Sequence, residues 1–298
     1  MDRRQFMKQC GVLGAASMLM PSALAVEKIP AESPLFFDIS LAQWSLHRQL
    51  RSSALSVLDF PVKTGEVFGI RAVEYVNQFF PDKAEDAAFL SQLKGRCDDH
   101  GVVSLLIMID GEGHLGAPLE SERLRAVENH YKWIDAAKYL GCHSIRVNIT
   151  GVGRSADVQS AAIDGLSRLC EFAAARDMSI IVENNVGYAS SGSWLAQVLS
   201  DVGLDNCGAL PDFGNFGDYD RYQGVADLMP YARGVSAKSF EFDAAGNELQ
   251  TDFLRMLKII KHYGYTGYIG VEFEGAGDED SGVMATKELL LRLGRTLS

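Results

Sequence analysis

The feature that most constrains the fold is an alternation of short strand-like runs with longer segments of helical period. Several short runs, such as Ile180–Val182, are continuously apolar, which is typical of strands buried on both faces of a parallel sheet. We expect eight strands, at Phe36–Gln43, Ala72–Val76, Val103–Ile109, Ser144–Ile149, Ser179–Glu183, Cys207–Pro211, Gly234–Lys238 and Tyr268–Phe273.

Between these runs, apolar residues recur three and four positions apart, as on one face of an amphipathic helix. The clearest helical segments are Lys83–His100, Glu120–Leu140, Asp157–Arg176 and Thr251–Tyr263. Gly101, Gly141 and Gly264 follow three of them, where a helix end favours a residue that tolerates positive φ. This alternation predicts an α/β fold, a single (β/α)₈ TIM barrel. The rival, a doubly wound open sheet, usually carries a glycine-rich turn after its first strand, and residues 41–47 contain no glycine.

The N-terminus has the pattern of an export signal. The segment Arg3–Lys8, Arg-Arg-Gln-Phe-Met-Lys, precedes an apolar run, Cys10–Met20, that is too short to span a bilayer. Small residues follow at Ser22–Ala25, and the whole stretch resembles a twin-arginine signal. We therefore expect residues 1–25 to be a twin-arginine signal peptide and residues 26–298 to form the barrel domain. The mature protein would then be periplasmic or otherwise exported.

Charge limits the partners of the chain. The formal net charge is −11, and Arg3, Arg4 and Lys8 outweigh Asp2 by two, so removal of the signal leaves −13. An acidic protein repels phosphate groups, so we expect no nucleic acid partner and no phosphorylated substrate. No later segment is apolar for long enough to span a membrane. A neutral small molecule or a metal cation fits better, and the sequence leaves a homo-oligomer open.

The cysteines do not suggest a disulfide framework. Four remain after the signal, Cys97, Cys142, Cys170 and Cys207, and they are widely separated. A zinc knuckle or a disulfide-rich scaffold would need closer spacing. We expect these side chains to pack in the core as small apolar residues.

Three acids stand at the ends of apolar strands, where the active sites of (β/α)₈ barrels form. Glu183 follows Ser-Ile-Ile-Val, Asp212 follows Cys-Gly-Ala-Leu-Pro, and Glu272 follows Tyr-Ile-Gly-Val. Acids that converge on one barrel mouth repel one another unless a cation or protons offset their charge. Oxygen ligands of this kind favour Mg²⁺ or Mn²⁺. The alternative is that each acid forms a local ion pair with Arg146 or Lys238.

Three motifs carry a resemblance to a known family. They are Val-Glu-Asn-Asn at 182–185, Pro-Asp-Phe-Gly-Asn at 211–215 and Gly-Val-Glu-Phe-Glu-Gly at 270–275, with Ser-Leu-Ala-Gln-Trp-Ser at 40–45 in support. Together they resemble the sugar phosphate isomerase/epimerase superfamily, the xylose isomerase-like TIM barrel family. The resemblance implies one divalent metal (Mn, Mg, Co or Zn) with Glu183, Asp212 and Glu272 among its ligands. It also implies that Glu183 and Glu272 are catalytic and move a proton next to a carbonyl.

One ligand position departs from the family pattern. The family usually has His-x-Lys on the seventh strand, whereas this chain has Val-Ser-Ala-Lys, with Ser236 in the usual histidine position. Asn185 likewise replaces a histidine that is common after strand five. Serine is a poorer ligand than imidazole for a divalent ion. The site could therefore bind metal weakly, recruit another ligand such as Glu274 or water, or work without metal through a carboxylic acid of raised pKa.

Other residues near the strand ends are candidates for contact with a small-molecule carbohydrate. We expect substrate contacts from His47, Glu74, His114, Arg146, Asn185 and Lys238. The alternative for His47 and His114 is that they carry protons. Arg146 and Lys238 either stabilise oxyanions or only form ion pairs. The four histidines in or next to helices are expected to be solvated. The aromatic residues that either stack on a sugar or pack in the core are Trp44, Phe79, Phe80 and Phe213.

The expected function is that of an exported isomerase or epimerase that abstracts a proton next to a carbonyl of a sugar or keto-sugar. A keto-glycoside lyase or hydrolase would begin with the same step, so the sequence does not separate the two. A non-catalytic sugar-binding barrel with a degenerate metal site is a third hypothesis. The endonuclease branch of the superfamily needs a multi-histidine metal cluster and a basic DNA track, and the sequence has neither.

Overall fold

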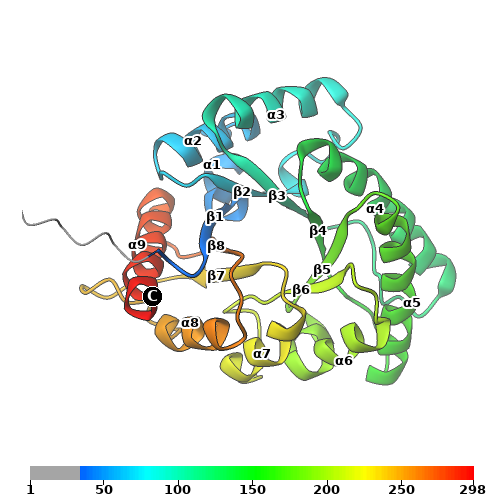
Figure 1. Ribbon diagram of the computed structural model, residues 1–298. Coiled ribbons are helices and arrows are strands. Elements are labelled where there is room, and N and C mark those ends of the chain that lie inside the picture. Colours follow the sequence, from blue (N-terminus) through cyan, green and yellow to red (C-terminus); the bar gives the residue numbers. More distant parts are fainter. Residues whose placement is uncertain (1–33) are drawn as a thin grey trace, which may run out of the picture. The chain divides into compact units, whose positions relative to one another are not determined.

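The computed structural model describes residues 34–298, and within them eight parallel strands form a closed barrel, which confirms the predicted fold class. The strands pair in the order β6-β5-β4-β3-β2-β1-β8-β7. Bridges Ala209–Ala232 and Asp212–Ser236 join the β6 and β7 edges. Figure 1 shows the strands at the centre and the helices around them. The strands are β1 (Asp38–Ala42), β2 (Ala72–Val76), β3 (Val103–Met108), β4 (Ser144–Val147), β5 (Ser179–Glu183), β6 (Cys207–Leu210), β7 (Val235–Ser239) and β8 (Tyr268–Phe273).

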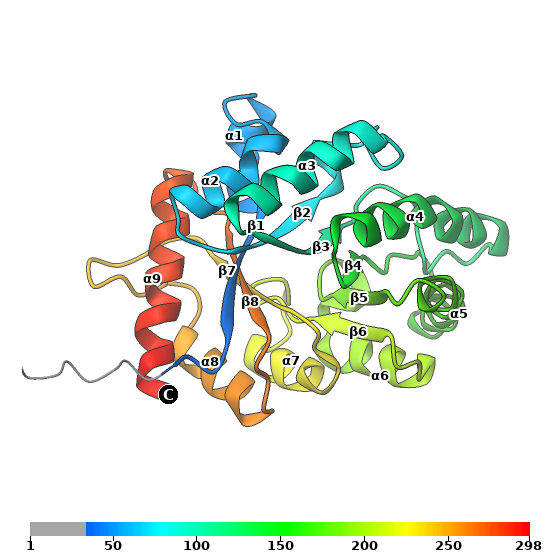
Figure 2. The ribbon, with the colours of Figure 1, turned by 45° about the horizontal axis from the view of Figure 1, so that its top comes forward.

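The helices lie outside the sheet, and several begin at a side-chain cap. Asp220, for example, accepts hydrogen bonds from the N–H groups of Tyr222 and Gln223, which offsets unpaired donors at the start of α7. Figure 2 shows α9 running beside α8 at one side of the barrel. The helices are α1 (His47–Arg51), α2 (Phe60–Glu66), α3 (Ala87–His100), α4 (Glu120–Leu140), α5 (Ser155–Ala174), α6 (Gly192–Val202), α7 (Arg221–Leu228), α8 (Phe253–His262) and α9 (Glu279–Leu297).

The predicted element boundaries hold to within a few residues. Helix α4 matches its expected span, α3 starts later than Lys83, and α5 lies two residues earlier than Asp157–Arg176 at both ends. Gly101 and Gly141 are left-handed caps, as expected. Gly264 also has a positive φ of 72°, but α8 already ends at His262, so it lies beyond the helix cap.

Alternation along each strand divides the buried side chains between two layers. In β2, Val73 and Tyr75 belong to the large apolar core between sheet and helices. Ala72 and Val76 belong to a smaller cluster with residues of β3, β5 and β6, which fills the barrel interior. Glu74 lies between them in the same alternation, so it points into the barrel.

Other expectations are settled in part. Cys97, Cys142, Cys170 and Cys207 are buried free thiols, as predicted. Among the described residues, no helix is long and apolar enough to cross a membrane. The predicted signal peptide lies outside the described residues.

Candidate active site

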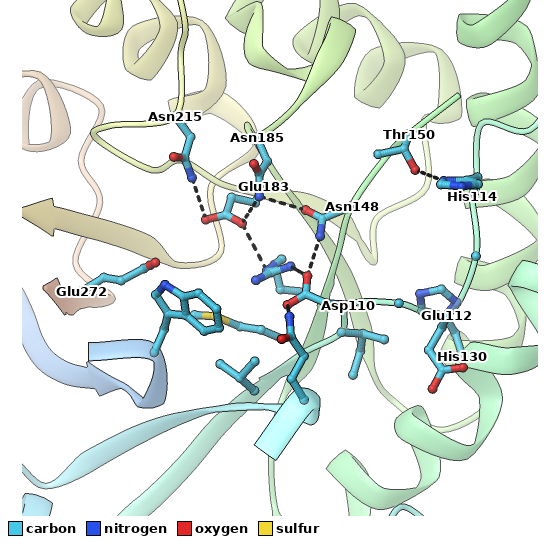
Figure 3. A pocket seen from close by; sticks show the side chains of 18 of the residues that line it. Asp110, Glu112, His114, His130, Asn148, Thr150, Glu183, Asn185, Asn215 and Glu272 are labelled. Carbon is cyan, nitrogen blue, oxygen red and sulfur yellow. Dashed lines mark hydrogen bonds and ion pairs between the residues drawn. The ribbon is translucent and has the colours of Figure 1, made fainter. Parts of the chain in front are cut away.

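A pocket of about 580 Å³ opens at the carboxyl ends of the strands, a size that suits a small-molecule ligand. Figure 3 shows side chains from several strands and loops pointing into it. Its wall combines carboxylates, amides, two cations and a few apolar groups. The lining includes Trp44, Gln78, Asp110, Glu112, His114, His130, Arg146, Asn148, Thr150, Glu183, Asn185, Asn215, Lys238, Glu272 and Glu274.

The three predicted acids do converge. Glu183 ends β5, Asp212 follows β6 and Glu272 is on β8, and each offers an oxygen within 4.8 Å of the others. Their side chains are almost completely buried, with exposed fractions of 2%, 0% and 4%. Acids so close together in a site shielded from water are unfavourable unless positive charge or protons accompany them.

Local backbone geometry fixes the position of Asp212. Its Oδ1 accepts hydrogen bonds from the backbone N–H groups of Gly214 (2.7 Å) and Asn215 (2.9 Å). Its own N–H donates to Asn184 Oδ1 at 2.7 Å. The other carboxylate oxygen, Oδ2, is buried and has no hydrogen-bond partner. A buried carboxylate oxygen without a partner is costly, so Asp212 fits a site in which a cation completes the contacts.

Two buried cations divide the acids between them. Lys238 Nζ lies 2.9 Å from Glu272 Oε1, 3.0 Å from Glu274 Oε2 and 3.9 Å from Asp212 Oδ2. Arg146 pairs with Glu183 at 3.3 Å and with Asp110 at 2.8 Å. Both cations form the ion pairs that the sequence allowed. Both also line the pocket, so the second expectation, contact with a substrate oxyanion, stays a prediction.

The acids differ in their affinity for a proton. Burial raises the pKa of Glu183 to about 8 despite Arg146, and Glu272 and Asp212 add to the rise. Burial likewise raises the pKa of Asp212 to about 6 against the effect of Lys238. Burial acts in the same direction on Glu272, but Lys238 and a hydrogen bond from Ser236 outweigh it and lower its pKa. The cluster therefore combines an acid that retains its proton with one that loses it readily.

Ser236 occupies the seventh-strand position and points toward the acids. Its hydroxyl donates to Glu272 Oε2 at 2.6 Å, so the serine supports a carboxylate instead of replacing an imidazole. The donor chemistry of Glu183, Asp212 and Glu272 fits a hard divalent cation. The Lys238 ammonium is a competing charge in the same cluster.

A row of polar groups extends from Glu183 toward β3. Asn185 Nδ2 lies 3.4 Å from Glu183 Oε2 and 3.5 Å from Asn148 Oδ1. Asn148 Nδ2 donates to Asp110 Oδ1 at 2.7 Å, and Arg146 donates to the same oxygen at 2.8 Å. Burial raises the pKa of Asp110, but the charge of Arg146 and hydrogen bonds from Arg146, Gln78 and Asn148 outweigh it and lower the pKa. Asp110 is therefore ionised at neutral pH. The row offers several fixed groups that suit hydroxyl recognition.

The remaining predicted substrate residues lie in different places. His114 lines the pocket and its Nδ1 contacts the Thr150 hydroxyl. His47 and Glu74 are not among the lining residues. The His47 ring stacks on Trp44, with 5.2 Å between the ring centroids, and Glu74 lies lower in the barrel with a hydrogen bond of 2.5 Å from Ser40. Their substrate roles stay predictions.

The aromatic candidates separate in the same way. Trp44 lines the pocket, and its indole N–H donates to Glu274. Phe79 packs against Trp44, with 5.9 Å between ring centroids. Phe80 and Phe213 are buried and contact aromatic rings of the outer core, Trp133 and Phe253 respectively. Of the four, Trp44 is the one in position to contact a ligand.

One expectation about the histidines was wrong. His130, which we expected to be solvated, is 3% exposed and lines the pocket from α4. The spacing of Ala126, Val127, His130, Trp133 and Ile134 places it on the buried stripe of the helix, a signal that was available in the sequence. Its Nδ1 lies 2.6 Å from the backbone carbonyl oxygen of Ala126. Since a carbonyl can only accept, Nδ1 carries the proton and Nε2 is an acceptor.

Comparison with known proteins identifies the family. A family model described as xylose isomerase-like TIM barrel matches residues 66–293. A search of curated proteins found no match. Many solved structures are similar.

Three of these structures illustrate the likeness. An L-ribulose 3-epimerase has a TM-score of 0.69 at 15% identity, covering 88% of this chain and 95% of its own. A xylose isomerase-like TIM barrel protein from Mycobacterium smegmatis, in complex with magnesium, has a TM-score of 0.66 at 16% identity, covering 87% and 97%. The 3-keto-D-glucoside 4-epimerase from E. coli has a TM-score of 0.64 at 13% identity, covering 87% and 99%.

At these identities the structural likeness shows the fold alone, whereas the family model covers most of the chain. The family resemblance of the three acidic motifs agrees with that match, and residues of all three motifs line one pocket. This chain belongs to the xylose isomerase-like TIM barrel family.

Proposed function

We propose that the protein is an exported isomerase or epimerase that moves a proton at a carbon next to the carbonyl of a sugar or keto-sugar. The observation that carries the proposal is the convergence of Glu183 and Glu272 in a pocket whose walls suit hydroxyl recognition. The sugar epimerases among the structural neighbours support it. Export rests on the N-terminal pattern of Arg3–Lys8 and the apolar run after it.

Two carboxyl groups from different strands suit this reaction. Removal of a proton next to a carbonyl needs a base, and return of a proton to the other face of the carbon needs an acid. Glu183 ends β5 and Glu272 is on β8, and we assign one to each face of the reacting carbon. In an epimerisation, one of these groups takes the proton and the other gives one back, so no net charge is created.

The neighbours of these glutamates hold them in place. Ser236 and Lys238 fix Glu272, with contacts of 2.6 and 2.9 Å, while Arg146 and Asn185 border Glu183. Negative charge develops on the substrate oxygen during proton removal, and a nearby cation stabilises it. Lys238 and Arg146 are the cationic side chains that line the pocket. We assign them the role of orienting the glutamates and offsetting this charge.

Glu183, Asp212 and Glu272 would hold a divalent cation, and the metal-bound proteins among the structural neighbours support such a site. When bound, it supplies positive charge that makes a proton next to a carbonyl more acidic. Asp212 Oδ2, which has no hydrogen bond and lies 3.9 Å from Lys238 Nζ, is the atom in this cluster that most needs such a contact.

A screen for solvent exchange tests the proposal. Free ketohexoses and ketose disaccharides are incubated with the purified protein in D₂O, with and without added Mn²⁺, and deuterium at carbon is measured by NMR. We expect deuterium next to the carbonyl with at least one ketose, and loss of the epimer product in Glu183→Gln. Glu288→Gln, which changes an exposed residue of α9, serves as the matched control and should behave as the wild type.

The outcomes separate the remaining hypotheses. Exchange accompanied by release of a sugar fragment would show the keto-glycoside lyase or hydrolase. Binding of sugars without any exchange would show a non-catalytic sugar-binding barrel and overturn the proposal.

A further inference from the structure

The pocket extends well beyond the acid cluster, to a region that proton transfer does not use. Figure 3 shows Glu272 at one side of the pocket and His114 with Thr150 at the other, with Asp110 and Asn148 between them. We call Glu112, His114, His130 and Thr150 the outer lobe. These residues come from the loop after β3, from α4 and from the loop after β4. They share one continuous cavity with Glu183 and Glu272.

The size of the cavity exceeds the needs of a single sugar ring. Its volume of about 580 Å³ lies within the range of sites that enclose drug-sized ligands. Because this volume is larger than one sugar ring, we expect a free monosaccharide positioned against Glu183 and Glu272 to leave part of the outer lobe unfilled. A ligand that fills both regions must carry a second group attached to the reacting sugar.

The outer lobe has the chemistry of a hydroxyl-binding site. His130 is 3% exposed, and because Nδ1 donates to Ala126 O, its Nε2 is an acceptor. Burial lowers the pKa of His130, so the ring is neutral. His114 and Thr150 provide groups that donate and accept. Sugar hydroxyls also donate and accept, so this set matches them.

Fixed contacts hold the acidic member of the lobe. Glu112 Oε1 accepts from the indole N–H of Trp133 at 2.6 Å and pairs with Lys132 at 3.0 Å. Asn129 Nδ2 donates to the Glu112 backbone carbonyl at 3.1 Å, which anchors the loop itself. Contacts from α4 therefore hold Glu112 and its loop in place.

The charge of the pocket wall limits which chemical group can be attached to the reacting sugar. Five acidic side chains line the pocket against two basic ones, and both basic ones, Arg146 and Lys238, already contact carboxylates. Such a wall repels phosphate and carboxylate groups. None of the four residues of the outer lobe has a large apolar side chain, which disfavours a hydrophobic group.

We propose that the outer lobe binds a second, uncharged sugar ring, so that the substrate is a keto-disaccharide or keto-glycoside in place of a free ketose. This inference rests on the proposed function, because it assigns the reacting ring to Glu183 and Glu272. It makes His114 and Thr150 specificity residues for the second ring.

The test compares two disaccharides with D-fructose: lactulose, in which a β-linked galactose ring is attached to fructose, and maltulose, in which an α-linked glucose ring is attached to fructose. Exchange in D₂O gives kcat/KM for each ketose. We expect a preference of about tenfold or more for a disaccharide, which corresponds to a few additional hydrogen bonds. In His114→Ala/Thr150→Ala the ratio of disaccharide to D-fructose should fall about tenfold. His262→Ala, an exposed change on α8, should leave the ratio as in the wild type.

Failure of this inference differs from failure of the proposed function. Exchange of D-fructose as efficient as that of both disaccharides, or a ratio unchanged in the double variant, would overturn the subsite. Absence of exchange with every ketose would overturn the proposed function. The subsite is then tested by calorimetry, which measures the affinity of the protein for lactulose and for D-fructose. Tighter binding of lactulose than of D-fructose, weakened in the double variant, would support it, and equal binding would overturn it.

Discussion

Replacement of Glu74 should change how the stability of the barrel depends on pH. Glu74 is 2% exposed, its Oε2 is buried without a partner, and burial raises its pKa from the ordinary 4.5 to about 7. The Ser40 hydroxyl opposes this rise and Glu272 adds to it. The folded protein therefore holds this proton at pH values where the unfolded chain has released it. Stability from this group is complete below about pH 4.5 and is lost as the pH rises through about 7.

The size of the effect follows from the two pKa values. Each pKa unit corresponds to about 1.4 kcal/mol, so the loss between low pH and pH 8 approaches about 3 kcal/mol. Glu74→Gln cannot titrate and should lack this decline. Since an amide retains an acceptor for the Ser40 hydroxyl, the change keeps the local hydrogen bond.

Urea unfolding at several pH values from 4.5 to 8, followed by circular dichroism in the presence of a chelator, measures the effect. The free energy of unfolding of the wild type minus that of Glu74→Gln should fall by about 3 kcal/mol across this range. Glu288→Gln should parallel the wild type. A difference that stays constant with pH would refute the idea that Glu74 is buried as a neutral acid.

Three further predictions concern the site and its support. Asp212→Asn should lose the divalent metal retained by protein purified without a chelator, measured by mass spectrometry of the metal; unchanged metal content would exclude Asp212 as a ligand. Arg146→Lys should lower kcat/KM for ketose exchange at least tenfold, because a compact ammonium cannot reach Asp110 and Glu183 as the guanidinium does, and an unchanged value would remove Arg146 from the site. Asp220→Ala should lower the free energy of unfolding by about 1 kcal/mol through loss of the α7 cap, and a thermal melt like that of the wild type would contradict this role.

The barrel fold could be predicted from the sequence because its strands are short apolar runs that alternate regularly with helices. The runs around Ile180 and Val271 are buried on both faces, so few other structures accommodate them. Helices such as α6 and α7 were not predicted individually. Helix α7 has eight residues, too few for a clear periodic pattern, and its start depends on the cap at Asp220.

The acids at the strand ends could also be placed, because strand order in a parallel barrel brings those ends together. What the sequence did not show was how charges are shared. Lys238 lies among Glu272, Glu274 and Asp212, and Ser236 donates to Glu272, contacts that depend on side-chain conformation. His130 is buried although a histidine on a helix is usually solvated, because its spacing places it on the apolar stripe of α4.

The roles of Glu183 and Glu272 are tested most directly by the rate of epimerisation of the best ketose substrate, measured from each epimer of the pair. Glu183→Gln and Glu272→Gln, each an isosteric change in a fully buried carboxyl group, are compared with the wild type in D₂O. We expect each variant to epimerise at least a hundredfold more slowly than the wild type, with the same circular dichroism. A variant that still epimerises at the wild-type rate would show that its glutamate does not transfer the proton, and would contradict the central claim.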